Sequence, residues 1–324
     1  MTEQSASTGS PALPGLPPGE EPVIALREVA KWYGEVVAVS DLSFGIGSGV
    51  TALLGPNGSG KSTTLNLISG LLAPSSGSIQ VFGQAMRGNP GIYKRMGLVS
   101  EHEQLYGMLT GHEFVRMNAI LQRVPSVESA TARAIATVDM TSAAERSVGG
   151  YSKGMRQRIK VAAALVHDPP VLLLDEPLNG ADPVQRASLI ALIRRLGEEG
   201  KTVVVSSHVL SEVERFARNV LVIVNGKLAA AGDFRTIRDR MDDRDHVVRI
   251  RCDAPRRLAA ALVSQAVTTS VRLDGSDRLV AETGDVRAFS RLLPEVARSA
   301  GIRLFEVQPV DESLASVFAY LVEK

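Results

Sequence analysis

One short stretch, GPNGSGKS at Gly55–Ser62, constrains this chain more than any other part of its sequence. It fits the pattern G-x-x-x-x-G-K-[ST] directly after the apolar run VTALL and directly before STTLNLIS. Glycines at such a strand-to-helix turn let successive backbone N–H groups point at one anion, and the helix dipole adds positive potential there. The sequence therefore predicts an α/β chain with a phosphate-binding loop at the end of a buried strand.

The residues of this loop predict two ligands, ATP and Mg²⁺. Lys61 would reach the β and γ phosphates of ATP, and the Ser62 hydroxyl would ligate Mg²⁺. The alternative is a glycine-rich turn that matches the pattern by accident, and the strand and helix on either side argue against it. The nucleotide-binding residues predicted from this stretch are Gly55, Pro56, Asn57, Gly58, Ser59, Gly60, Lys61, Ser62 and Thr63.

A second run, VLLLDEP, predicts the acidic half of the same site. Its apolar residues form a strand that ends at Asp175, where the carboxylate can hold the metal ion through water. Glu176 follows directly and is placed to polarise the attacking water as a general base. Taken alone, this segment is a strand followed by an acidic turn, and the phosphate-binding loop upstream favours the catalytic interpretation.

Composition limits the class of protein. The chain has 324 residues, enough for one large domain and a smaller one. Its formal net charge of +1 lacks the basic surplus of a nucleic-acid binder. The longest apolar runs, such as VAAALV, fall far short of the roughly 20 residues that cross a bilayer. The single cysteine, Cys252, excludes an internal disulfide and fits a reducing compartment. Because no charged and then apolar leader opens the chain, we expect no secretion.

Changes in composition and residue pattern along the chain predict three parts. Residues 1–21 are rich in Ser, Pro and Gly and predict a disordered tail, because they cannot bury enough apolar surface. Residues 22–238 alternate apolar strands with helical stretches, as α/β sheets do. Within them, the segment of about 92–166 has a mostly helical pattern and predicts an inserted helical subdomain. The strands expected in this larger domain are VIALREV, VVAVSDLSF, VTALLG, SIQVFG, VLLLD, TVVVSS and NVLVIV.

The third part, residues 246–324, predicts a small α+β accessory domain. It follows the Arg- and Asp-rich run FRTIRDRMDDRD and begins with the strand HVVRIRC and the helix PRRLAAALVSQ. Two strands, a helix and a last strand come next, in the order βαββαβ of a split βαβ module. We expect Pro294 to interrupt the second helix, and the ending SLASVFAYLVEK predicts a final amphipathic helix.

Taken together, the order and spacing of these motifs resemble the nucleotide-binding subunit of an ATP-binding cassette (ABC) transporter, over residues of about 23–232. The resemblance implies a P-loop NTPase fold with a mixed β-sheet core and a helical subdomain. It also identifies KWYG as similar to the family's adenine-stacking loop, with Tyr33 as the stacking ring. The alternative is that Tyr33, or its neighbour Trp32, is a core aromatic residue.

Two further segments resemble family loops that touch the γ phosphate and the metal ion. MGLVSEHEQLYGMLTG resembles the segment in which a glutamine normally bridges Mg²⁺ and the attacking water, and here that position is Glu101. A carboxylate can still coordinate Mg²⁺, but it adds negative charge near the phosphates. Gln104 could take the role only if the loop register slips. SSHVL resembles the family's switch region, so the resemblance implies that His208 hydrogen-bonds the γ phosphate.

The stretch YSKGMRQR resembles the family's signature loop, Leu-Ser-Gly-Gly-Gln. Ser152 and Gly154 are kept, whereas Lys153 and Met155 replace a glycine and the glutamine. In the family this loop serves the ATP bound to the opposite subunit, from a helix N-terminus. Ser152 as a helix N-cap is compatible with that role. LNGADP resembles the loop that signals between subunits, with Asp182 as its acidic residue.

The resemblance implies a homodimer that closes head to tail over ATP and opens after hydrolysis. The C-terminal module and the ending VDESLASVFAYLVEK resemble ATPases that pair with ABC-2 type exporter permeases. We therefore expect an ATPase that is peripheral at the cytoplasmic face of a bacterial membrane. Its expected partner is a transmembrane permease on a separate chain, and no nucleic-acid partner is expected.

Two other classes of protein share parts of this pattern. One is a non-transport cassette ATPase that remodels ribosomes or DNA. Those that act on ribosomes typically carry two cassettes joined by a long charged linker, whereas this chain has one phosphate-binding loop and no basic surplus. A P-loop kinase has no need for the signature loop or for the loop with Asp182. The sequence therefore favours the transporter ATPase over both.

Overall fold

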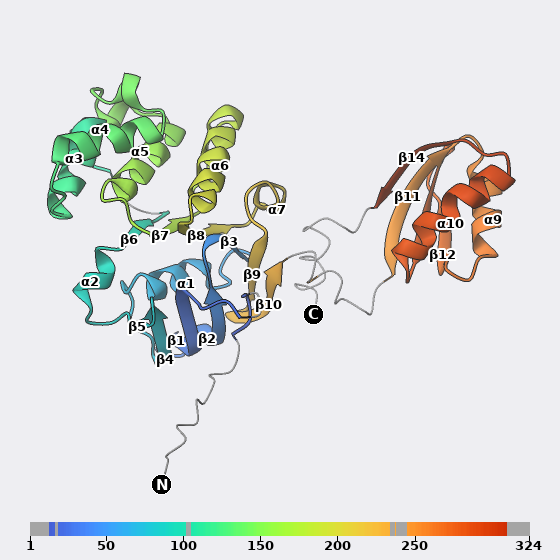
Figure 1. Cartoon of the computed structure of the whole chain (residues 1–324), viewed down its shortest axis with the longest axis horizontal. Coiled ribbons are helices and arrows are strands. Elements are labelled where there is room, and N and C mark those ends of the chain that lie inside the picture. Colours follow the sequence, from blue (N-terminus) through green and yellow to red (C-terminus); the bar gives the residue numbers. More distant parts are fainter. Residues whose placement is uncertain (1–12, 17–18, 102–104, 234–236, 238–244, 310–324) are drawn as a thin grey trace, which may run out of the picture. The chain divides into compact units, whose positions relative to one another are not determined.

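The computed structural model describes residues 13–16, 19–101, 105–233, 237 and 245–309 (Figure 1). The chain divides into two compact units, Met1–Asp233 and Phe234–Lys324. Among the described residues, no helix is both long enough and apolar enough to cross a bilayer. Each unit is considered by itself below.

The larger unit is built on two sheets. Four strands pair antiparallel in the order β2-β1-β4-β5, and these are Ile24–Tyr33 (β1), Val36–Ile46 (β2), Ser76–Val81 (β4) and Gln84–Ala85 (β5). The other described sheet has the order β10-β9-β3-β8-β7-β6, in which only β10 runs antiparallel. Its strands are Gly49–Leu54 (β3), Met96–Val99 (β6), Val171–Asp175 (β7), Thr202–Ser207 (β8), Asn219–Val224 (β9) and Lys227–Asp233 (β10). The expected mixed β-sheet core is confirmed.

The order of the parallel strands brings the expected site residues to one edge. Strand β8 lies between β3 and β7, so the carboxyl ends of all three meet there. The strands are continuous apolar runs because both faces of the sheet are covered. Helix α1 (Lys61–Ile68) packs one side, and its Leu65 shares a buried cluster with Leu53 of β3 and Phe44 of β2. This shared core holds the phosphate-binding loop rigidly against both sheets.

The remaining helices of this unit are α2 (Pro90–Tyr93), α3 (Gly111–Leu121), α4 (Val127–Thr137), α5 (Lys153–Leu165), α6 (Pro183–Glu198) and α7 (Leu210–Val213). Helices α3, α4 and α5 gather into one group, as Figure 1 shows in green. Thr110 and Glu113 form a reciprocal capping box at the start of α3. The group begins later than residue 92, because Met96–Val99 pairs with β7 as an edge strand.

Residues 13–16 and 19–21 of the expected disordered tail are described, and Pro14 and Leu16 lie against the fold. The backbone N–H of Gly45 in β2 donates to the carbonyl of Pro14 at 2.9 Å. An added Cβ on Gly45 would lie 2.5 Å from a side-chain carbon of Leu16. Residues 1–12 and 17–18 lie outside the described residues, so disorder of the tail stays a prediction.

The smaller unit confirms the expected βαββαβ order. It comprises His246–Cys252 (β11), Pro255–Val263 (α9), Ser270–Leu273 (β12), Arg278–Thr283 (β13), Val286–Ser299 (α10) and Leu304–Pro309 (β14), with sheet order β12-β13-β11-β14. Helices α9 and α10 cover one face of the sheet (Figure 1). Pro294 lies inside α10 without ending it, because Phe289, Leu293 and Val296 on either side are buried in the core. The expected interruption is therefore wrong. The expected final helix lies outside the described residues.

Candidate active site

A cavity of about 630 Å³ opens at the edge where strands β3, β7 and β8 end. Its walls come from the start of β2, the phosphate-binding loop, the loop after β6, the turn after β7 and the residue after β8. The residues that line it are Val36, Val37, Ala38, Asn57, Gly58, Gly60, Lys61, Ser62, Thr63, Glu101, Glu176, Asn179 and His208. The structure thus brings together most of the residues that the sequence analysis assigned to one nucleotide site.

The phosphate-binding loop depends on glycine at its last turn. Gly60 has a φ of 104°, a conformation that residues with a side chain rarely adopt. A Cβ at this position would also lie 2.7 Å from a methyl carbon of Val39 and 2.8 Å from the carbonyl oxygen of Ala38. The loop can therefore pack against β2 and still present its backbone N–H groups to the cavity.

Lys61 is folded back onto the loop. Its Nζ donates to the carbonyl oxygens of Gly55 at 2.8 Å and Pro56 at 3.1 Å, and it lies 4.0 Å from Oε1 of Glu176. The residue is only 6% exposed. Burial lowers the pKa of the Lys61 ammonium, and the negative charges of Glu176 and Asp175 oppose that shift. The carbonyl groups of the loop thus fix the Lys61 ammonium at the wall of the cavity, where it can contact anionic oxygens of a ligand.

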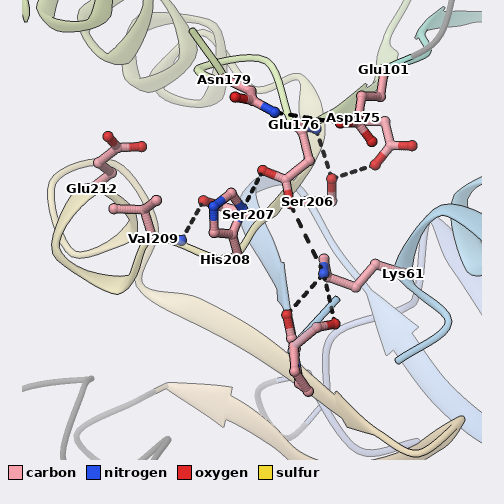
Figure 2. Close-up of polar contacts among 12 residues, drawn as sticks. Lys61, Glu101, Asp175, Glu176, Asn179, Ser206, Ser207, His208, Val209 and Glu212 are labelled. Carbon is pink, nitrogen blue, oxygen red and sulfur yellow. Dashed lines mark hydrogen bonds and ion pairs between the residues drawn. The ribbon is translucent and has the colours of Figure 1, made fainter. Parts of the chain in front are cut away.

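The two acidic residues after β7 are held by a serine on the neighbouring strand. The Ser206 hydroxyl donates to Oδ1 of Asp175 at 2.6 Å and accepts from the backbone N–H of Glu176 at 2.8 Å. Both Asp175 and Ser206 are buried. Figure 2 shows Ser206 between the two acidic residues. Sequence reasoning missed Ser206, although the pairing of Asp175 with Ser206 follows from the register of β7 and β8.

Glu176 points into the cavity between Lys61 and His208. Its Oε2 lies 3.0 Å from Nδ1 of His208, and Figure 2 shows both side chains turned toward each other. Burial raises the pKa of the Glu176 carboxyl, and the His208 hydrogen bond and the Lys61 charge oppose this shift. A carboxylate with a raised pKa is a stronger base. Glu176 also has a φ of 48°, an uncommon conformation that aims its side chain into the cavity.

Glu101 lines the same cavity and contacts a residue that the sequence analysis did not assign. Nδ2 of Asn179 donates to Oε1 of Glu101 at 3.4 Å, while Nζ of Lys160 on α5 donates to the backbone carbonyls of Ser100 at 3.2 Å and Glu101 at 3.4 Å. Glu101 therefore lies at the same cavity as the phosphate-binding loop, and its equivalence to the family's glutamine stays a prediction. Gln104 lies outside the described residues.

The donor atoms around the cavity suit Mg²⁺. The exposed hydroxyl of Ser62 and the carboxylates of Glu101 and Asp175 are oxygen donors, which Mg²⁺ prefers. In the described part of the chain, no cluster of three or more His, Cys, Asp or Glu side chains could hold a metal alone. Where Mg²⁺ binds together with a nucleotide, it is usually held by one or two protein groups, phosphate oxygens and water.

Tyr33 does not line the cavity. Its ring is 49% exposed, and Nζ of Lys31 lies 5.1 Å from its centroid. Trp32 is exposed as well, so neither aromatic residue belongs to the core. Val36 and Val37 at the start of β2 line the cavity instead. The role of Tyr33 in stacking on adenine stays a prediction.

The signature residues and Asp182 lie at helix starts outside this cavity. The Ser152 hydroxyl caps α5 by accepting from the backbone N–H of Met155 at 3.2 Å. Asp182 caps α6, because its Oδ1 accepts from the backbone N–H groups of Val184 and Gln185. Gly154 packs against α6, where a Cβ would lie 1.5 Å from Oε1 of Gln185. Within the described residues, these groups are structural caps and contacts.

Comparisons with known proteins agree with this geometry. The family model described as "ABC transporter" matches residues 39–179. The bacitracin transport ATP-binding protein BcrA of Bacillus licheniformis is 30% identical over 308 residues, which cover 93% of this chain and 97% of BcrA. The linearmycin resistance ATP-binding protein LnrL of Bacillus subtilis (strain 168) is 34% identical, with 65% of this chain and 69% of LnrL covered. A solved ATP-binding subunit of an ABC transporter matches with a TM-score of 0.61 and 27% identity, over 67% of this chain and 92% of that chain.

Proposed function

The chain belongs to the ABC transporter ATP-binding proteins, and from that premise we propose that it is the ATPase of an ABC-2 type exporter that powers a separate transmembrane permease. Relatives named for bacitracin transport and linearmycin resistance support the exporter assignment. The similarity to BcrA extends over 97% of that protein, so it includes the C-terminal unit. The proposed site of action is the cytoplasmic face of a bacterial membrane, without a nucleic-acid partner.

The observation that carries the proposed mechanism is the placement of Glu176. Its carboxylate lies 4.0 Å from the ammonium of Lys61 and 3.0 Å from the ring of His208, at the inner end of the nucleotide cavity. In this position Glu176 would accept a proton from the attacking water. His208 would orient that carboxylate and contact the γ phosphate. Lys61 would exchange its loop carbonyls for the β and γ phosphates.

Mg²⁺, when bound, would offset negative charge on the phosphate oxygens. Ser62 would contribute its hydroxyl, and Asp175 would act through water from its hydrogen bond to Ser206. Glu101 would take the position of the family's glutamine, with Asn179 holding its carboxylate. Of these residues, Ser62, Glu101 and Asn179 line the cavity, and Asp175 is buried next to Glu176, which lines it too.

We propose that two copies complete each site head to tail. Ser152 and Gly154 begin α5 away from the cavity, so on this scheme they would contact ATP held by the partner copy, and Asp182 would signal between the copies. Loss of the γ phosphate removes its contacts to Lys61, His208 and the opposite Ser152 and lets the dimer open. Opening and closing is the movement passed to the permease.

The test uses Glu176→Gln, which keeps the shape of the side chain and removes the base. With ATP and Mg²⁺ we expect hydrolysis to stall and a dimer to accumulate, measured by phosphate release and by light scattering after size exclusion. Lys61→Ala is the matched control, because weakened phosphate contacts predict no ATP-dependent dimer. Normal turnover by Glu176→Gln would sink the general-base assignment.

The permease assignment needs a separate experiment. Tagged Glu176→Gln protein, trapped with ATP, would be isolated from its own bacterium and its bound chains identified by mass spectrometry. A polytopic membrane protein in stoichiometric amount supports the exporter reading. Recovery with ribosomes or DNA, at the same salt concentration, would support the non-transport alternative instead.

A further inference from the structure

A buried carboxylate lies a short distance along the chain from His208. Glu212 belongs to the short helix α7, four residues after His208, and is only 6% exposed. Its Oε1 lies 2.8 Å from Nη1 of Arg186 on α6, with which it forms an ion pair. Figure 2 shows Glu212 on the turn that follows His208. A carboxylate that leaves water needs such a partner, because an unpaired buried charge is costly.

The same arginine also holds the loop that contains Asp182. Nη2 of Arg186 donates to the backbone carbonyl of Ala181 at 3.3 Å, and the backbone N–H of Arg186 donates to the carbonyl of Asp182 at 2.8 Å. Ala181 is buried, and its own N–H donates to the carbonyl of Leu178 in the turn after β7. A planar guanidinium with several donors suits contacts in two directions. One side chain therefore binds both the carboxylate of α7 and the backbone of the loop between β7 and α6.

These contacts join the two segments that meet in the nucleotide cavity. The side chains of Glu176 and His208 lie 3.0 Å apart there. Ala181 comes five residues after Glu176. Glu212 comes four residues after His208, and Arg186 joins the two segments. The His208 side chain is 44% exposed, so burial alone does not fix its ring. The position of the ring therefore depends on how the segments after β7 and β8 are held together.

We propose that Arg186 and Glu212 are positioning residues, which hold the segment after β8 against the segment after β7 and so keep the His208 ring beside Glu176. The inference rests on the proposed function, in which Glu176 and His208 act in ATP hydrolysis. Neither Arg186 nor Glu212 is among the described residues that line the nucleotide cavity, so both act through His208. Stability alone does not account for such a pair, because apolar side chains of similar volume are often as stable as a buried ion pair.

The first experiment replaces both charged residues with apolar ones of similar size in the full-length protein. Arg186→Met with Glu212→Leu leaves no unpaired charge, so urea unfolding should show little change in stability. With ATP and Mg²⁺ we expect kcat to fall at least about tenfold while KM for ATP changes by less than about twofold. The matched control is Arg194→Met with Glu198→Leu, an exposed ion pair on the same helix, which should leave kcat unchanged.

A second measurement follows the His208 ring without any hydrolysis. The protein is labelled with ¹⁵N at its histidines, and the His208 ring signal in the NMR spectrum is assigned by its loss in His208→Ala. Glu176→Ala gives the reference signal of a ring that has lost its partner. Arg186→Met with Glu212→Leu should move the His208 signal toward that reference. An unmoved signal would overturn the proposal, as would a kcat within about twofold of the unmodified protein.

Arg186→Lys keeps the proposal testable if the double variant fails to fold. Lysine retains a charge opposite Glu212, but its ammonium lacks the planar fork that also reaches the carbonyl of Ala181. We expect kcat to fall and the His208 signal to move in the same direction, and no change in either would overturn the proposal. Normal turnover by Glu176→Gln is a separate outcome, because it removes the general-base assignment while the NMR signal still reports the position of His208.

Discussion

Ser206 is expected to be the anchor of the acidic pair, and Ser206→Ala tests this directly. The fully buried hydroxyl holds Asp175 at 2.6 Å and the backbone N–H of Glu176 at 2.8 Å. A hydrogen bond to a charged group contributes about 1.5–3 kcal/mol, and a buried donor left unpaired costs about 1–3 kcal/mol. Because the two effects overlap, we expect Ser206→Ala to lower the free energy of unfolding by about 2–4 kcal/mol.

The neighbouring serine provides the control. Ser207 is also buried, and within the described residues its hydroxyl accepts a neutral bond, from the backbone N–H of Val209 at 3.0 Å. Its replacement by alanine is expected to lower the free energy of unfolding by about 0.5–1.5 kcal/mol. Unfolding in urea would be followed by the fluorescence of Trp32, the single tryptophan of the chain, which lies in the unit that holds the site. Nucleotide is left out, because binding adds its own stability.

The rate constant kcat distinguishes a role of Ser206 in positioning Glu176 from a role in stability alone. If Ser206 positions Glu176, then Ser206→Ala also lowers kcat at a temperature where the variant is fully folded, whereas Ser207→Ala does not. The reasoning is refuted if Ser206→Ala unfolds within about 0.5 kcal/mol of the unmodified protein, the range of ordinary surface changes. A loss of stability with unchanged kcat would refute the positioning role alone.

Three further outcomes are expected. Burial raises the pKa of Glu176 in the folded state, so the fold favours the protonated carboxyl. The contribution of Glu176 to the free energy of unfolding is therefore full below pH 4.5 and is lost as pH rises through the folded-state pKa. In urea unfolding, Glu176→Gln should gain stability relative to the unmodified protein as pH rises to 8, because glutamine does not ionise. Glu101→Gln should keep or raise the rate of ATP hydrolysis while Glu101→Ala lowers it, and a loss seen only in Gln104→Ala would show that the register is wrong. Gly154→Ala should change the free energy of unfolding by less than about 1 kcal/mol, because the new Cβ would meet only the end of the flexible Gln185 side chain, which can turn away. A larger loss that Gln185→Ala restores would show instead that the Gln185 side chain is held in place.

Much of the fold follows from patterns that are local. Strands β7, β8 and β9 were expected from the runs VLLLD, TVVVSS and NVLVIV, and their bounds agree because each contains an apolar run that is followed directly by a polar residue. A prediction from a local sequence signal was wrong where tertiary packing opposes that signal. Pro294 remains helical because buried neighbours hold α10 together.

The sequence by itself determined which side chains meet at the site, because the phosphate-binding loop, the acidic pair and His208 each follow directly after a strand. Only the tertiary structure decided which groups hold them. Ser206 reaches Asp175 through the register of two strands 31 residues apart, and Asn179 reaches Glu101 across 78 residues. No local pattern encodes such contacts, since they depend on how strands are ordered in the sheet.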